Sequence, residues 1–108
     1  MAAPVKIVLE WQWPADVLAF AIEQNAQVYL DPMLEATRQI FPDARWIRVH
    51  TQADAEIPDE LSIIFDVKTP GITASEIKRR RRKWNSEMFR ICPAQRAVPF
   101  VLLLDLGD

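Results

Sequence analysis

The sequence predicts an α+β fold in which a four-stranded antiparallel sheet carries helices on one face. Three observations predict it. Four segments alternate between apolar and polar residues with the period of a strand, and two longer segments have the apolar spacing of a helix. Breaks that contain proline separate most of these segments. The length of 108 residues suits one domain, so we expect residues 1–108 to form a single folded unit.

The first strand and the first helical region occupy residues 5–11 and 14–41. Residues 5–11 alternate strictly, and Pro14 then favours the first turn of a helix. Asp31 and Pro32 resemble an N-cap followed by the first helical residue, so the region is either two helices or one kinked helix. The apolar stripe expected to face the core consists of Leu18, Ile22, Tyr29, Met33, Ala36 and Ile40, with Asn25 on the same stripe.

The second half of the predicted fold is a strand pair, a helix and a last strand. Residues 46–50 and 61–67 are rich in β-branched and aromatic side chains and are expected to pair antiparallel. A capping box over residues 73–76 starts a helix that covers residues 76–91, and residues 100–106 form the last strand. The order βαββαβ matches the split βαβ, or ferredoxin-like, plan. The alternative is a three-stranded sheet with residues 5–11 as an N-terminal arm.

Composition limits the classes of function. The chain has one cysteine, Cys92, and one histidine, His50, which exclude a disulfide within the chain and a set of soft zinc ligands. Its two glycines exclude a phosphate-binding loop. We therefore expect no metal, no cofactor and a small buried thiol at Cys92. The absence of a long apolar run predicts a cytoplasmic protein that does not enter a membrane.

Charge is divided unevenly along the chain. Residues 1–67 carry four basic and eleven acidic side chains, whereas residues 68–108 carry nine basic and four acidic ones. The net charge of −2 conceals this division. Such asymmetry favours docking of one half on the other, within one chain or between two.

The sheet face that the helices leave bare is the first candidate site. If Leu61, Ile63, Phe65 and Val67 point at the helices, alternation places their neighbours on the opposite face. That face would be unusually apolar for a monomer, which predicts a homodimer or another protein partner. The interaction face is expected to include Val8, Trp46, Arg48, Ile64, Val101 and Leu103.

The same face also holds a group of ionisable residues. Glu10, His50, Asp66 and Asp105 would lie near Arg48 in a partly apolar setting, where burial and neighbouring charges change proton affinities. This group indicates an alternative function, a small-molecule or enzyme site. Plain cross-strand ion pairs are the simpler interpretation.

The helix over residues 76–91 is the third candidate, because six consecutive cations occupy residues 78–83. Trp84 falls on its buried stripe, so we expect a core residue there. Arg80 and Arg81 are expected to reach acidic groups of the N-terminal half. The residues predicted to contact nucleic acid are Arg79, Arg82, Lys83 and Arg90. Taken together, the sequence favours a non-catalytic interaction or assembly module, with nucleic-acid binding and a ligand or enzyme site as alternatives.

Overall fold

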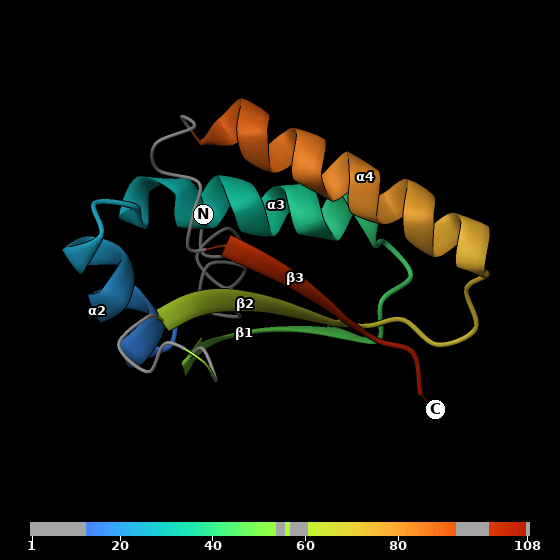
Figure 1. Ribbon diagram of the computed structural model, residues 1–108, viewed down its shortest axis with the longest axis horizontal. Helices are drawn as coiled ribbons and strands as arrows, with labels where there is room; N and C mark the ends of the chain where they lie inside the picture. The colour runs from blue at the N-terminus through green and yellow to red at the C-terminus, as the bar shows by residue number, and fades with distance from the viewer. Residues whose placement is uncertain (1–12, 54–55, 57–60, 93–99, 108) are drawn as a thin grey trace, which may run out of the picture.

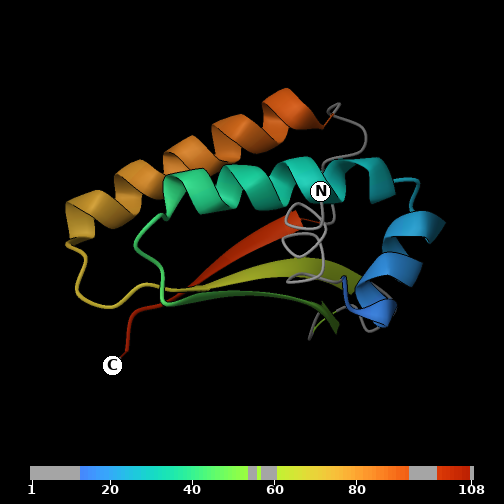
Figure 2. The same ribbon diagram turned by 180° about the vertical axis from the view of Figure 1, so that it is seen from behind.

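A computed structural model describes residues 13–53, 56, 61–92 and 100–107 of the protein. Two helices lie side by side over one face of a three-stranded sheet, and a shorter helix lies at one end of it (Figure 1; Figure 2 shows the reverse side). The elements are α2 (Ala15–Glu23), η1 (Gln27–Tyr29), α3 (Leu30–Ile40), β1 (Trp46–Ala53), β2 (Leu61–Lys68), α4 (Ala74–Ile91) and β3 (Phe100–Asp105). Within these residues, no helix is both long enough and apolar enough to cross a bilayer.

The sheet is mixed and has the order β1-β2-β3. β1 and β2 are antiparallel, with Trp46 opposite Lys68. β2 and β3 are parallel, with Ile63 opposite Phe100, and α4 makes the connection between them. A parallel pair needs a long crossover of this kind, which is why the helix separates the two strands in the sequence.

The predicted four-stranded antiparallel sheet is therefore wrong, whereas the α+β class is confirmed. In the split βαβ plan the first strand lies between the third and the fourth, so that all neighbours are antiparallel. Here the third and fourth predicted strands are β2 and β3, and they pair directly. β2, the central strand, buries Ile63, Ile64 and Phe65 in succession. The predicted strand over residues 5–11 lies outside the described residues.

The first helical region divides earlier than expected. α2 ends before Asn25, whose φ of 58° places it in the left-handed region. The Ala26 N–H donates to the Ala21 carbonyl at 2.8 Å and the Asn25 N–H to the Ile22 carbonyl at 3.1 Å, the pair of bonds of a Schellman motif. Asn25 is thus an exposed helix terminator and not a residue of the apolar stripe. Asp31 lies inside the first turn of α3.

This break changes which side of α2 faces the core. Val17 and Ala21 are fully buried, whereas Leu18 and Ile22 are 38% and 50% exposed, contrary to the prediction. A single helical wheel over residues 14–41 fails because Asn25 allows α2 and α3 to take independent rotations. Within α3 the prediction holds, since Met33, Ala36 and Ile40 are buried.

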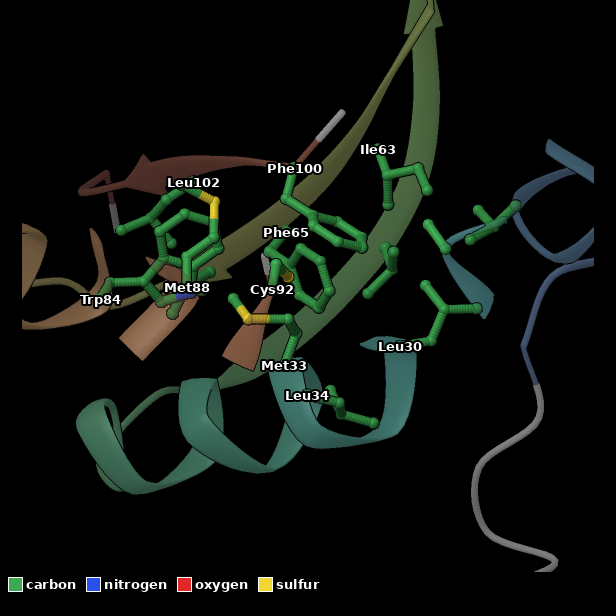
Figure 3. Packing of buried hydrophobic residues seen from close by; sticks show 14 of the residues in the cluster. Leu30, Met33, Leu34, Ile63, Phe65, Trp84, Met88, Cys92, Phe100 and Leu102 are labelled. Atoms are coloured by element: carbon green, nitrogen blue, oxygen red, sulfur yellow. The ribbon is translucent and has the colours of Figure 1, made fainter. Parts of the chain in front are cut away.

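The core lies between the sheet and the helix pair (Figure 3). The Phe65 ring of β2 lies 6.0 Å from the Trp84 ring of α4 and 5.9 Å from the Phe100 ring of β3, measured between centroids. Trp84 and Cys92 are each 1% exposed, which confirms the core tryptophan and the buried thiol. The other helix, α3, contributes Leu30, Met33 and Leu34 to the same core cluster.

Candidate interaction surfaces

The sheet face opposite α3 and α4 is organised in three cross-strand rows. Strand register places Trp46, Lys68 and Asp105 in the first row and Arg48, Asp66 and Leu103 in the second. The third row consists of His50, Ile64 and Val101. Every predicted residue of this face that the structure describes lies in these rows, whereas Val8 and Glu10 lie outside the described residues. We call this surface the open sheet face.

Exposed apolar area on the open sheet face is concentrated on β3. Val101 and Leu103 are 39% and 46% exposed, but Ile64 of the central strand is only 6% exposed. Ile64 nevertheless does not belong to the helix-side core cluster. The exposed apolar patch is therefore narrower than the sequence predicts, because Ile64 adds almost no exposed surface to it.

On β1, the Arg48 guanidinium lies over the Trp46 ring, 3.8 Å from its centroid. The two residues are separated by one position, so strand alternation places them on the same face. The Arg48 side chain is exposed, and Trp46 is half-buried. Stacking on the ring holds the flexible arginine in one orientation at the surface.

Asp66 lies at the centre of the predicted polar group. Its Oδ2 is 3.9 Å from Arg48 Nη2 and 3.8 Å from His50 Nε2. Its Oδ1 is buried and accepts no hydrogen bond from the described residues. Use of His50 and Asp66 in catalysis or ligand binding stays a prediction.

Asp105, at the end of β3, is paired with Lys68. The Gly107 backbone N–H donates to Asp105 Oδ1 at 3.1 Å, and Lys68 Nζ lies 3.4 Å from the same oxygen. These donors hold the pKa of Asp105 below its ordinary value, with the backbone bond the larger cause. Lys68 is not among the residues predicted for this face, because the predicted strand ends at Val67. If the strand is extended by one residue, the alternation of side chains places Lys68 on this face.

On α4, several of the consecutive cations are committed to ion pairs. Glu76 binds Arg79 Nη2 and Arg80 Nε, each at 2.8 Å, and these bonds lower the pKa of Glu76 to about 2. Arg80 Nη1 also lies 2.8 Å from Asp43 Oδ1, which confirms its predicted reach to the acidic half. Arg81 instead donates to the Leu102 carbonyl of β3 at 3.4 Å.

The four cations predicted to contact nucleic acid divide into two kinds. Arg79 is paired with Glu76, and Arg90 with Glu87 at 2.7 Å. Arg82 and Lys83 make no ion pair within the described part of the chain, and neither does Lys78. All three are exposed.

An exposed aromatic residue that was not predicted as part of a site lies on the same side of the helix. Phe89 is 62% exposed, although it directly follows the buried Met88. Its position outside the stripe of Trp84 and Met88 on a helical wheel is the signal that could have identified it.

A surface hollow of about 210 Å³ lies between the end of α3 and α4. It is lined by Gln39, Ile40, Pro42, Arg79, Arg80 and Lys83. Among the residues that the structure describes, no group of three His, Cys, Asp or Glu side chains is placed to hold a metal ion.

Comparison with protein-family models, with curated proteins and with solved structures gave no match for this chain.

Proposed function

We propose that the protein is an assembly module that forms a homodimer through its open sheet face. The observation that carries the proposal is the sharing of one helix-free face by exposed apolar residues and a stacked tryptophan–arginine pair. Leu103 and Val101 supply the apolar area, and Trp46 with Arg48 supplies the stacked pair. Tryptophan and arginine are the residue types that contribute most often to binding energy at interfaces.

A second copy of the chain is the partner that the charges favour. The rows carry Arg48 and Lys68 as cations and Asp66 and Asp105 as carboxylates, so the face is balanced when His50 is neutral. A two-fold symmetric interface brings a surface against itself, and a strongly charged surface would repel its copy. A surface whose positive and negative charges balance can face its own copy without net repulsion.

Burial of apolar surface adds a reason for contact. Val101 and Leu103 are 39% and 46% exposed. Docking of a second copy would bury them, at about 25 cal/mol for each Å² of apolar surface removed from water.

Light scattering coupled to size-exclusion chromatography tests the proposal with two matched variants. Leu103→Glu places a charge on the open sheet face, whereas Val28→Glu makes the same chemical change at η1, where Val28 is 68% exposed. We expect the wild type and Val28→Glu to elute with the mass of two chains and Leu103→Glu with that of one. A wild type that stays monomeric at high micromolar concentration would overturn the proposal, as would a Leu103→Glu variant that stays dimeric.

A further inference from the structure

The outer surface of α4 combines unpaired cations with an exposed aromatic ring. α4 carries seven basic and two acidic side chains, so its side chains contribute a charge of +5. Both acids, Glu76 and Glu87, are engaged by arginines of the same helix. The homodimer proposed above uses the opposite side of the molecule and leaves this helix surface unexplained.

Helical geometry sorts the exposed residues of α4 into two stripes. At 100° for each residue, Lys78, Arg82, Asn85 and Phe89 fall within an arc of about 60°. Lys78 and Arg82 are thus about 6 Å apart along the axis, and Phe89 lies about 10 Å further on. We call these four residues the outer stripe. All four are exposed.

The neighbouring stripe holds Arg79, Lys83 and Arg90. Arg79 and Arg90 are neutralised by the carboxylates three residues before them. Lys83 lies one turn before Glu87 and helps to lower the pKa of that carboxyl, after the larger effect of the Arg90 hydrogen bond. Within the described residues, the cations of α4 that make no ion pair are Lys78, Arg81, Arg82 and Lys83. Of these, Lys78 and Arg82 share the outer stripe with Phe89.

We infer that the outer stripe of α4 binds single-stranded nucleic acid. Lys78 and Arg82 would neutralise successive phosphates, and Phe89 would stack on an unpaired base. Asn85 lies between them and offers both a donor and an acceptor to a base edge. A duplex keeps its bases stacked on each other, so an exposed ring on a helix favours a single strand.

The structure favours nucleic acid over a membrane surface as the partner. A helix that adsorbs to lipid buries a broad apolar face in the headgroup layer. In α4 the apolar residues Trp84 and Met88 face the protein core, and Phe89 is the large apolar residue that α4 exposes. One ring among cations supplies little area for insertion, but it is sufficient for stacking on one base.

Fluorescence anisotropy with a labelled oligouridine of about 12 nucleotides tests the inference across a range of salt concentrations. The matched variants are Lys78→Ala/Arg82→Ala and Arg79→Ala/Arg90→Ala, which remove equal charge from the same helix. We expect the first to weaken binding about tenfold and to lower the salt slope by roughly two. The second pair is expected to change affinity by less than about threefold, because these arginines are already paired.

A substitution at Phe89 separates stacking from charge. Phe89→Leu keeps an apolar side chain but removes the ring, so binding should weaken about tenfold without a change in salt slope, while Phe89→Tyr retains affinity. The inference fails if the wild type does not bind the oligouridine at low salt, or if both double variants lose affinity equally. It fails equally if polyglutamate or anionic vesicles compete for the wild type as well as unlabelled oligouridine does. None of these outcomes bears on the homodimer, which light scattering tests separately.

Discussion

The indole Nε1 of Trp84 donates a hydrogen bond of 2.9 Å to Thr37 Oγ1 in the buried layer between α4 and α3. The Thr37 hydroxyl in turn donates to the Met33 carbonyl at 2.7 Å. Both residues are almost fully buried, at 1% and 0% exposure. These two hydrogen bonds fix the rotation of α4 against α3, because they require the side of α4 that carries Trp84 to face the side of α3 that carries Thr37.

Replacing Thr37 with valine should destabilise the protein by about 1 to 3 kcal/mol, because the shape is kept while the buried indole N–H loses its acceptor. Urea unfolding followed by tryptophan fluorescence measures the change. Thr37→Ser keeps the hydroxyl and should recover most of the bonding contribution. In the background of Trp84→Phe, the valine substitution should cost much less, and equal costs in the two backgrounds would contradict the assigned bond.

The ion pairs of Glu76 predict a loss of stability in acid. Its pKa is lowered from 4.5 to about 2 in the folded state, chiefly by the Arg79 hydrogen bond and then by Arg80. A carboxyl with a lowered folded pKa stabilises the protein above its unfolded pKa and loses that contribution as the pH falls towards 2. The free energy of unfolding should therefore fall with pH between about 5 and 2, and Glu76→Gln should flatten this dependence.

Glu35→Gln is the matched control for this acid dependence. The Glu35 carboxylate accepts the Gln39 side-chain amide bond and pairs with no cation in the described part of the chain. The control should follow the wild-type profile. A Glu76→Gln profile that is as steep as the wild type would show that the pair contributes nothing.

The turn before α4 depends on the one glycine with a positive φ. Gly71 has a φ of +85°, and a Cβ placed there would meet no atom within 4 Å. Gly71→Ala should thus cost about 1 to 2 kcal/mol through backbone strain alone. Gly107→Ala adds a Cβ in ordinary contact, 3.6 Å from Asp105 Oδ1, and should be close to neutral. Thermal unfolding of both variants checks the difference, and equal melting temperatures would contradict it.

The rotation of α2 can be tested with three alanine substitutions. Val17 is fully buried, so Val17→Ala should cost about 2 kcal/mol through lost burial and a small cavity. Leu18→Ala and Ile22→Ala remove more atoms but from exposed positions, and should cost less than about 1 kcal/mol each. Chemical denaturation ranks the three. A larger loss of stability for Leu18→Ala than for Val17→Ala would contradict the observed rotation of α2 and support the apolar stripe that the sequence predicts.

Local patterns in the sequence predicted the strands and their faces, but not how the strands are joined. Alternation placed Arg48, Asp66 and Leu103 on one side correctly, because the period of two is a property of each strand alone. The choice between pairing β3 with β2 and inserting another strand depends on contacts distant in sequence. No local pattern encodes that choice.

In the helices, too, local patterns predicted some features and not others. Thr73 caps α4 as predicted and accepts a bond from the Glu76 N–H at 3.2 Å, since capping is decided within one turn. Asn25 could not be identified as a terminator from hydrophobic spacing, because the apolar residues on either side continue a plausible stripe. The pairing of Arg79 with Glu76 and of Arg90 with Glu87 is local, at a spacing of three residues, and could have been predicted from the sequence.

The parallel pairing of β2 with β3 gives the two halves of the sheet different entropic costs. β1 and β2 are joined by a short connection, whereas more than thirty residues, including all of α4, separate the end of β2 from the start of β3. Closing the larger loop restricts the conformations of more residues before any hydrogen bond between β2 and β3 forms to offset that entropic cost. We expect the hairpin to organise first and β3 to be the last strand fixed, so that weakening β3 speeds unfolding more than it slows folding in stopped-flow experiments.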